Sequence, residues 1–427
     1  MKLRNINEQV MVITGATSGI GLTTARMAAE QGAQLMLIAR NEDELVRLRN
    51  EISEKGGRAI HYSADVADER SLRDAAARCV DAFGRIDTWV NNAGVAIYGK
   101  VMDVSEEDAR RLFETNYWGV VAGSRVAVEH LRESGGALIN VGSEVSDMPV
   151  PLLGPYCASK HAVKGFTDVL RMELESEGLP ISVTLIKPTA THTPFPENAK
   201  NYMPFEPQVP QPIYAPELVA EAIIYCAQHP VRDFFVGEMA AMHSAMATYT
   251  PRVNDKLMEA VGESMQNSGE PSTINRRDGL HNTNSQLRER GAADRFVMET
   301  SVYQKAKIHP LITAGLLAGG GIALAAYFGK RVGRTDGYDR PGSGRLSTPR
   351  TGVFSGISER MEVVGSDGQH VGMVDKVENN QIKLTRNDEL AGGKHHLLPM
   401  DLVDTVAQNR VRLNRPAREA MTIWRAV

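Results

Sequence analysis

The sequence predicts an α/β fold: a doubly wound parallel sheet of seven strands, followed by a hydrophobic helix and a small C-terminal β-rich domain. Short apolar runs alternate with longer amphipathic segments through residues 10–237, which is the pattern of βαβ units. A glycine-rich turn follows the first run, and the composition becomes polar from about residue 251. The 427 residues exceed one ordinary core, so more than one unit is expected.

The composition argues against several classes of function. A formal net charge of −4 and a pI near 6.3 provide no general attraction to nucleic acid or to an anionic membrane. The three cysteines, Cys79, Cys157 and Cys226, form neither a disulfide framework nor a CxxC metal pattern, which indicates a reducing compartment. Residues 1–10 lack the apolar core of a signal peptide, so we expect a cytoplasmic protein.

Seven strands are expected in the first 250 residues, with helices between them. The expected strands lie near residues 10–14, 34–39, 58–63, 88–91, 137–141, 182–186 and 234–237. One helix follows Asn41, with Glu44 three residues later in the manner of a capping box.

The turn after the first expected strand reads Thr14-Gly15-Ala16-Thr17-Ser18-Gly19-Ile20-Gly21. Glycines between a strand and a helix let the backbone approach a pyrophosphate at the helix N-terminus, where free N–H groups and the helix dipole favour an anion. Such turns also serve as plain tight connections, but the position after the first strand favours dinucleotide binding.

The end of the second expected strand distinguishes the two nicotinamide cofactors. A preference for NAD(H) would place an acid there to accept hydrogen bonds from the ribose 2′-OH, whereas this chain has Ala39 and Arg40. An arginine can hold a 2′-phosphate through a forked, charge-assisted contact. NADP(H) is therefore favoured over NAD(H); the alternative is that Arg40 is a solvated surface residue beside Asn41.

Tyr156 and Lys160 lie four residues apart at the start of a helical pattern, which places them on one face of the helix. At about 4.5 Å and an effective dielectric constant near 20, the ammonium would stabilise the phenolate by roughly 3–4 kcal/mol. That attraction predicts a phenol pKa lowered by about 2–3, which would allow proton transfer at physiological pH. Tyrosine and lysine also occur at this spacing by chance.

The glycine spacing, taken with Asp65, Asn91-Asn92-Ala93-Gly94, Asn116, Ser143, Tyr156 and Lys160, resembles the short-chain dehydrogenase/reductase family over residues 5–250. The resemblance implies a Rossmann-type sheet of seven strands and a bound nicotinamide dinucleotide. It also implies a homodimer or homotetramer that pairs through the helices carrying Asn116 and Tyr156.

The resemblance implies a role for each matching residue. Tyr156 would exchange a proton with the substrate oxygen, Lys160 would assist it, Ser143 would donate to that oxygen, and Asn116 would hold a water. The residues expected to bind the cofactor are Gly15, Thr17, Ser18, Gly19, Ile20, Gly21, Arg40, Asp65, Val66, Asn92, Ala93, Gly94, Tyr156, Lys160, Pro188 and Thr193. No metal is expected.

Two loops are candidates for the substrate site. The segment at 195–216 is rich in proline and apolar residues, as binding loops and lids often are. With Met148, Val150, Leu152 and Leu153 of the other loop, it suggests an apolar pocket, although these residues could simply pack the loops down. Thr189 departs from the glycine that the family usually has at this position.

The C-terminal part is expected to contain a polar linker at 251–307, an apolar segment at 308–328 and a Gly/Arg-rich linker at 329–356. The apolar segment contains no charged residue and, at about 20 residues, could span a bilayer as a helix. A soluble apolar helix or an interfacial anchor is the alternative, because the segment is rich in glycine and alanine and is followed by Lys330, Arg331 and Arg334.

Residues 357–427 read as a small β-rich domain. The run from Val363 to Asp375 resembles PRC-barrel-like domains of unknown function, which implies an interaction module. The adjacent His395 and His396 are expected to be loop residues, since no other metal ligand is placed with them.

The sequence therefore predicts an NADP(H)-dependent oxidoreductase that interconverts a carbonyl and a secondary alcohol on a hydrophobic substrate. The alternative is an NADP(H)-binding sensor or scaffold that uses the C-terminal domain for interaction. The set of Asn116, Ser143, Tyr156 and Lys160 favours the enzyme, because a sensor has no need of an acid.

Overall fold

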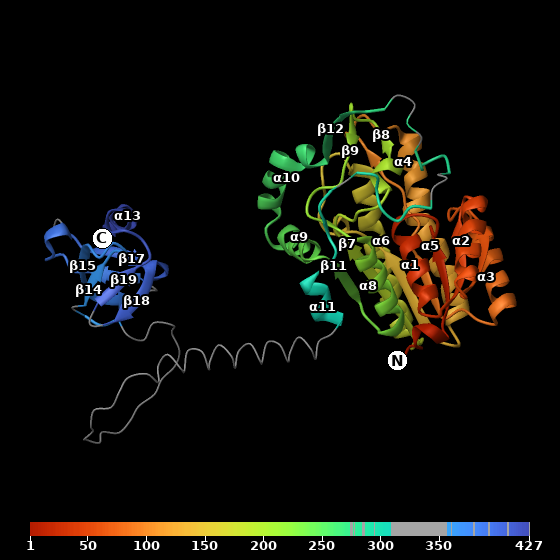
Figure 1. Ribbon diagram of the computed structural model, residues 1–427, viewed down its shortest axis with the longest axis horizontal. Helices are drawn as coiled ribbons and strands as arrows, with labels where there is room; N and C mark the ends of the chain where they lie inside the picture. Colours follow the sequence, from red (N-terminus) through yellow and green to blue (C-terminus); the bar gives the residue numbers. More distant parts are fainter. Residues whose placement is uncertain are drawn as a thin grey trace, which may run out of the picture. The chain divides into compact units, whose positions relative to one another are not determined.

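The computed structural model describes residues 1–273, 276, 278–283, 287–293, 295–308, 357–359, 361–378, 381–391, 393–407 and 410–426. The chain divides into two compact units, Met1–Gly333 and Arg334–Val427, and each is described by itself (Figure 1).

The first unit is built on a seven-stranded parallel sheet with the order β11-β7-β6-β4-β1-β2-β3. The strands are β1 (Val10–Thr14), β2 (Gln34–Ala39), β3 (Arg58–Ser63), β4 (Thr88–Asn91), β6 (Gly136–Val141), β7 (Ile181–Pro188) and β11 (Asp233–Val236). All seven predicted strands are thus confirmed. The central strands are buried on both faces, which explains their continuous apolar runs.

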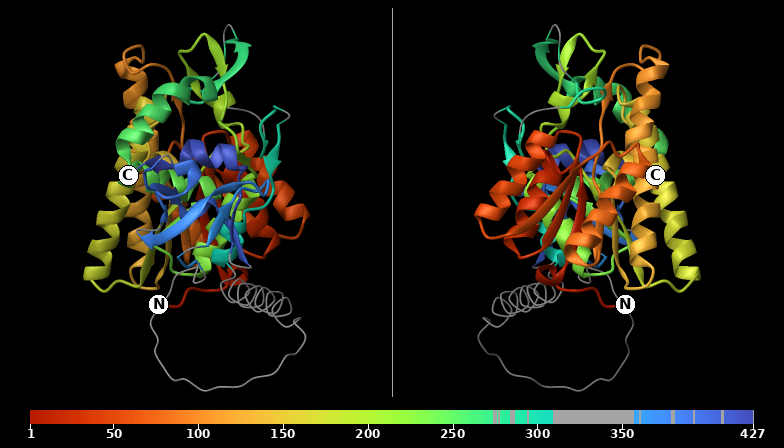
Figure 2. Two further views of the ribbon diagram at one scale, coloured as in Figure 1. Left: turned by 90° about the vertical axis from the view of Figure 1, so that its left-hand side faces the viewer. Right: turned by 90° about the vertical axis from the view of Figure 1, so that its right-hand side faces the viewer.

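Helices cover both faces of this sheet (Figures 1 and 2). One face carries α1 (Gly19–Glu30), α2 (Glu42–Glu54) and α8 (Pro216–Gln228), and the other carries α3 (Glu69–Phe83), α5 (Gly119–Leu131) and α6 (Gly154–Ser176). The predicted cap of α2 is present, because Asn41 Oδ1 accepts a hydrogen bond of 3.2 Å from the Glu44 N–H. The strand order reverses between β1 and β4, where open α/β sheets bind ligands.

The segment at 195–216 contains short elements rather than one irregular loop. They are α7 (Phe195–Asn198), β8 (Lys200–Asn201), β9 (Phe205–Pro207) and β10 (Ile213–Tyr214). β8 pairs with β5 (Ile97–Tyr98), and Met203 and Phe205 are buried in the same apolar cluster as Tyr156. The chain therefore holds this segment above the carboxyl ends of the strands.

The structure differs from the polar linker expected over 251–307. α9 (Glu238–Tyr249) is followed by α10 (Pro251–Gln266), β12 (Asn267–Pro271), β13 (Val297–Met298) and α11 (Val302–Ile308). β12 pairs with β9, β13 pairs with β10, and the Gln304 amide of α11 donates to the Leu218 carbonyl at 2.7 Å. Described polar side chains of this segment bind residues elsewhere in the first unit: Gln266 donates to the Pro151 carbonyl and Arg276 pairs with Glu206.

The predicted apolar segment at 308–328 lies outside the described residues except for Ile308, the last residue of α11, and so does the linker at 329–356. Within the described ranges, no helix is long and apolar enough to cross a membrane.

The second unit is β-rich, as predicted. Its seven-stranded sheet has the order β18-β19-β14-β15-β16-β17-β20 and packs around an apolar cluster that includes Val363, Ile382 and Leu398. The elements are β14 (Glu362–Val364), β15 (His370–Glu378), β16 (Gln381–Leu384), β17 (His396–Pro399), β18 (Val403–Ala407), β19 (Arg410–Leu413), α13 (Ala417–Ile423) and β20 (Arg425–Ala426).

Candidate functional site

The turn between β1 and α1 forms a cradle that only glycine permits at three positions. Gly15 and Gly19 have φ angles of +67° and +50°, which side chains rarely adopt. A Cβ on Gly21 would lie 2.2 Å from the Gly15 carbonyl oxygen and 2.5 Å from Asn92 Nδ2. Ser18 makes no side-chain cap hydrogen bond with α1. The backbone is thus shaped to let a phosphate approach the N-terminus of α1.

Two cavities meet at this cradle, and together they hold nearly all of the predicted site residues. The larger, of about 250 Å³, is lined by Gly15, Ser18, Gly19, Ile20, Asn92, Ala93, Gly94, Ser143, Tyr156, Lys160, Pro188 and Thr193. The smaller is lined by Gly15, Thr17, Ser18, Arg40, Asp65, Val66, Ala93 and Gly94. Gly21 and Asn116 lie behind these walls. Together the two cavities could hold an extended dinucleotide, whose nicotinamide end would occupy the larger cavity and whose adenosine end would occupy the smaller.

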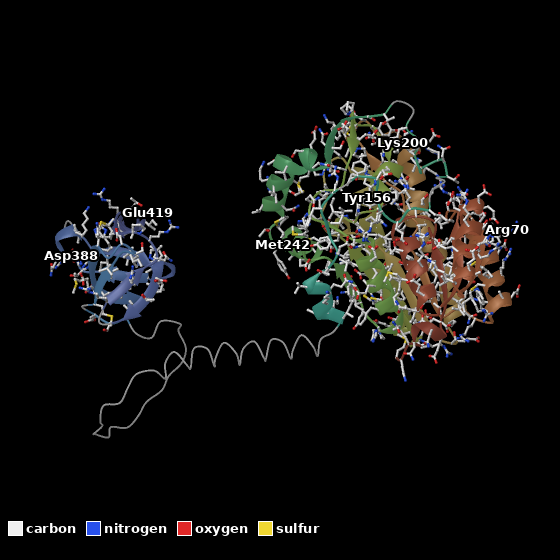
Figure 3. The ribbon with its side chains drawn as sticks, in the orientation of Figure 1. Arg70, Tyr156, Lys200, Met242, Asp388 and Glu419 are labelled. Carbon is white, nitrogen blue, oxygen red and sulfur yellow. The ribbon has the colours of Figure 1, made fainter. Side chains whose placement is uncertain are left out.

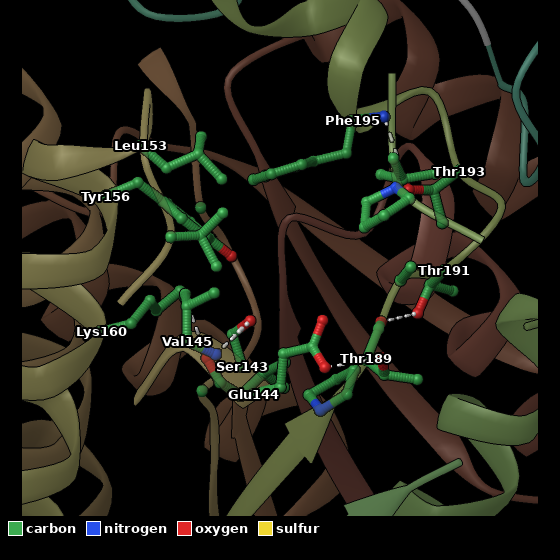
Figure 4. Close-up of a pocket in the computed structure, with 18 of the residues that line it drawn as sticks. Ser143, Glu144, Val145, Leu153, Tyr156, Lys160, Thr189, Thr191, Thr193 and Phe195 are labelled. Atoms are coloured by element: carbon green, nitrogen blue, oxygen red, sulfur yellow. Dashed lines mark hydrogen bonds between the residues drawn. The ribbon is translucent and has the colours of Figure 1, made fainter. Parts of the chain in front are cut away.

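Ser143, Tyr156 and Lys160 converge at the carboxyl end of β6 (Figure 4). Ser143 follows β6 and begins a short 3-10 turn, η3 (Glu144–Ser146), while Tyr156 and Lys160 project from the first two turns of α6. Lys160 Nζ donates to the Val141 carbonyl at 2.8 Å, and it lies 5.9 Å from the centre of the Tyr156 ring. The Tyr156 side chain lies in the interior of the first unit, whereas Met242 on α9 is exposed (Figure 3).

The predicted lowering of the Tyr156 pKa is wrong for this arrangement. Burial raises the pKa of the Tyr156 phenol well above its usual range, and the hydrogen bond with Ser143 only partly opposes the shift. Burial also lowers the pKa of the Lys160 ammonium to about 8. Desolvation disfavours the charged form of each group, which the sequence spacing could not show. Tyr156 is therefore held as a neutral acid.

Asn116 lies in a π-helical turn, η2 (Glu114–Trp118), between α4 (Glu106–Phe113) and α5. Its amide accepts from the Val95 N–H at 2.8 Å and donates to the Val95 carbonyl at 2.9 Å and to Ser159 Oγ at 3.1 Å. A Cβ on Gly94 would lie 3.5 Å from Asn116 Oδ1 and 3.8 Å from Lys160 Nζ. Asn116 thus ties the loop after β4 to α6 beside Lys160, and π-helical turns are frequent at functional sites.

The larger cavity extends beyond Tyr156 into an apolar chamber. Its apolar lining comes from β5, from both predicted loops and from α10, and it comprises Tyr98, Val145, Met148, Val150, Leu153, Phe195, Val209, Pro210, Met258 and Met265. Leu152 instead packs within the neighbouring apolar cluster. The contribution of α10 was hidden from sequence reasoning, because the polar surface of this helix made the whole segment look like a linker.

Residues 276, 278–283 and 287–293, which we call the strap, lie against the cofactor cradle. The Gly19 N–H at the start of α1 donates to the Arg288 carbonyl at 2.9 Å. Ion pairs secure the strap at Arg26–Glu289 and at Lys200–Asp278, and Glu197 binds both the Arg288 guanidinium and the Ala292 N–H. A pyrophosphate that used the Gly19 N–H would have to replace the Arg288 carbonyl.

Arg40 has partners that the sequence did not suggest. Its guanidinium donates to the carbonyl oxygens of Gly279, Leu280 and Asn282 in the strap. Arg40 also lines the smaller cavity beside Asp65, whose carboxylate pairs with Arg111. The strap residues Gly279 and Thr283 complete the wall of this cavity, so a distant segment helps to shape the adenosine end.

Two profiles of known families match the chain. The short chain dehydrogenase profile matches residues 9–203. A profile described as an uncharacterized protein conserved in bacteria, DUF2171, matches residues 357–421, which fall in the β-rich unit.

Known proteins resemble the chain over different lengths. The uncharacterized oxidoreductase YxnA of Bacillus subtilis is 43% identical over 322 residues, which covers 75% of this chain and 90% of that protein. A 3beta-hydroxysteroid dehydrogenase of Mediterraneibacter gnavus is 32% identical over 45% of this chain and 70% of that protein. The structure of an alcohol dehydrogenase from the archaeon Thermococcus sibiricus, complexed with 5-hydroxy-NADP, is 27% identical over 53% of this chain and 94% of that chain, with a TM-score of 0.47.

Proposed function

This chain belongs to the short-chain dehydrogenase/reductase family of oxidoreductases, and on that premise we propose that it is an NADP(H)-dependent enzyme interconverting a carbonyl and a secondary alcohol. The observation that carries the proposal is the convergence of Ser143, Tyr156 and Lys160 between the glycine cradle and an apolar chamber. The chamber favours an apolar substrate, and the name of the hydroxysteroid dehydrogenase among the relatives belongs to the same substrate class.

The side chains have distinct roles in the proposed reaction. A reduced nicotinamide held at the cradle would supply hydride to the carbonyl carbon. Tyr156 would give its phenolic proton to the carbonyl oxygen as charge develops there, and Ser143 would donate a hydrogen bond to the same oxygen. Because burial keeps Tyr156 protonated, the resting site is prepared for reduction rather than for oxidation.

The preference for NADP(H) is supported by the charge at the adenosine end. Arg40 follows β2 and lines the smaller cavity together with Thr17 and Asn41, while the strand itself ends on the uncharged Ala39. The contacts of Arg40 with the strap use three of its five N–H groups and leave Nε–H and one Nη1–H for a charge-assisted contact with a 2′-phosphate.

The rate of carbonyl reduction is expected to fall as the pH rises through about 8, because the pKa of Lys160 is lowered to about that value. Below pH 8 the ammonium is charged and can support Tyr156, and above it this donor loses its proton. A pH profile of kcat/KM from about pH 6 to 10 measures the effect. A profile that stays flat through this range would exclude Lys160 as the group that titrates.

Unfolding at high pH would not explain this loss of activity, because the ionisation of Lys160 changes stability in the opposite direction. The folded pKa of Lys160 lies below its ordinary value, so between about pH 8 and 10.5 the unfolded chain binds a proton that the native chain has lost. This group therefore makes the native state more stable as the pH rises through that window. Thermal unfolding at each pH separates the two effects, and a Lys160→Met variant should show a low rate without this step.

A homodimer or homotetramer is also proposed, and exposed apolar side chains on the relevant helices support it. Trp118 at the end of η2 is 56% exposed, and Val169 and Met172 on α6 are 49% and 59% exposed. Covering such side chains with the same face of a second copy would remove apolar surface from water. Sedimentation that gives only the monomer mass would dismiss this proposal.

The full chain should oxidise NADPH when it is mixed with apolar ketones, and the absorbance of NADPH reports the reaction. Tight binding of NADPH without turnover of any ketone, aldehyde or secondary alcohol would instead support a sensor that responds to the cofactor. Turnover with NADH but not with NADPH would overturn the cofactor assignment alone.

A further inference from the structure

The larger cavity also contains a carboxylate, which no motif in the sequence indicates. Glu144 directly follows Ser143 in η3, is 8% exposed, and lines the larger cavity together with Thr189 and His243. Thr189 stands just beyond β7, and His243 lies on α9. Three elements that are distant in sequence thus bring these polar side chains together in the wall of the larger cavity.

The two oxygens of Glu144 have different surroundings. Oε2 accepts a hydrogen bond from Thr189 Oγ1 at 2.8 Å and contacts His243 Nδ1 at 2.8 Å. Within the part of the chain that the structure describes, Oε1 has no hydrogen-bond partner. Figure 4 shows this oxygen directed into the cavity, toward the space between Tyr156 and Phe195.

In a purely structural role, Glu144 would only connect β7 to α9 through its contacts with Thr189 and His243. That role explains both contacts of Oε2 but does not explain why Oε1 faces the cavity without a hydrogen-bond partner among the described residues. A carboxylate in an apolar site is costly unless hydrogen-bond donors surround it. The free oxygen therefore needs a donor from water or from a ligand, and it faces the cavity in which the proposed substrate would bind.

We propose that Glu144 determines substrate specificity by accepting a hydrogen bond from a hydroxyl group of the substrate. The proposal rests on the proposed function and names its substrate class: an apolar ketone with a hydroxyl group close to the reacting carbonyl. The Cα atoms of Ser143 and Glu144 are about 3.8 Å apart across one peptide bond. Because both residues also line the same cavity, one small molecule can place its carbonyl at Ser143 and its hydroxyl at Glu144. The negative charge also disfavours a substrate that carries a carboxylate.

The test compares three substrates of one chain length: an aliphatic 2-ketone, the same ketone with a hydroxyl on the neighbouring carbon, and a keto acid. The wild-type chain with NADPH should prefer the hydroxyketone over the plain ketone by about 10- to 100-fold in kcat/KM, since the acceptor is charged. The preference should appear mainly in KM, because the hydroxyl binds equally in the ground state and the transition state.

Glu144→Gln should reduce that preference about tenfold and raise kcat/KM for the keto acid by a similar factor. These changes have opposite signs, and the loss of a purely structural contact would lower both rates together. Thr189→Val is the matched control, because it removes a donor to Oε2 and leaves both carboxylate oxygens. Its rates are expected to change while its preference for the hydroxyketone remains.

The outcomes separate this inference from the function on which it rests. Equal turnover of the ketone and the hydroxyketone by the wild-type chain would overturn the role of Glu144 and leave the reductase intact. Turnover of no carbonyl compound would overturn both. The wild-type comparison can overturn the proposal in this way even if Glu144→Gln fails to fold.

Discussion

Tyr156→Phe is expected to lower kcat/KM for carbonyl reduction by about 10²- to 10⁴-fold, the usual contribution of a general acid. The substitution removes only the hydroxyl and keeps the ring, whose centre lies 5.5 Å from that of Phe195. Packing and cofactor affinity should therefore change little. Steady-state kinetics with a ketone gives the loss, and fluorescence titration with NADPH shows whether binding is kept.

The control for this substitution is Tyr225→Phe. Tyr225 lies on α8 and stacks on His229 with ring centres 4.2 Å apart, away from both cavities. Removing its hydroxyl should leave the rate within about twofold. If Tyr156→Phe kept more than about a tenth of the rate while folding normally, another group would have to supply the proton.

Arg40→Asp is expected to raise the Kd for NADPH about 30- to 100-fold and to leave that for NADH within a few-fold. A charge-assisted contact between a guanidinium and a phosphate contributes about 2–3 kcal/mol, and a carboxylate in its place would repel the phosphate. Titration of the two reduced cofactors measures the ratio. If Arg40→Asp weakened the binding of NADPH and NADH by the same factor, the role of Arg40 would be to hold the strap and not to bind the 2′-phosphate.

Glu197→Ala is the matched control for the strap. It removes the contacts with Arg288 and Ala292 but leaves Arg40 and the smaller cavity unchanged. Because the strap and a pyrophosphate share the Gly19 N–H, this variant should change the affinities for NADPH and NADH by the same factor. A change in the ratio of the two affinities would show that the strap itself selects the cofactor.

Local sequence signals predicted most of the first unit. The seven strands, the cap at Asn41 and the glycine turn depend on residues within a few positions of one another, so periodicity and turn chemistry suffice to find them. The same reading failed at 251–307, where a polar composition suggested a linker. There, partners far away in the sequence hold the segment in place, as Leu218 holds Gln304 and Glu217 holds Arg290.

For the candidate catalytic pair, too, the sequence predicted one property correctly and another wrongly. The sequence alone was enough to bring Tyr156 and Lys160 together, because four residues make about one turn of a helix. It could not give the direction of the pKa shift, since desolvation depends on everything that covers the pair.

By itself, then, the sequence determined the family and the sheet and indicated the candidate catalytic residues, because the signals for all three are local in the chain. Only the tertiary structure decided what covers these residues. It placed the strap over Gly19 and set His243 against Glu144, from a position 99 residues away. Burial and hydrogen bonding between distant residues have no signature in a single segment, because they arise only when separate elements pack together.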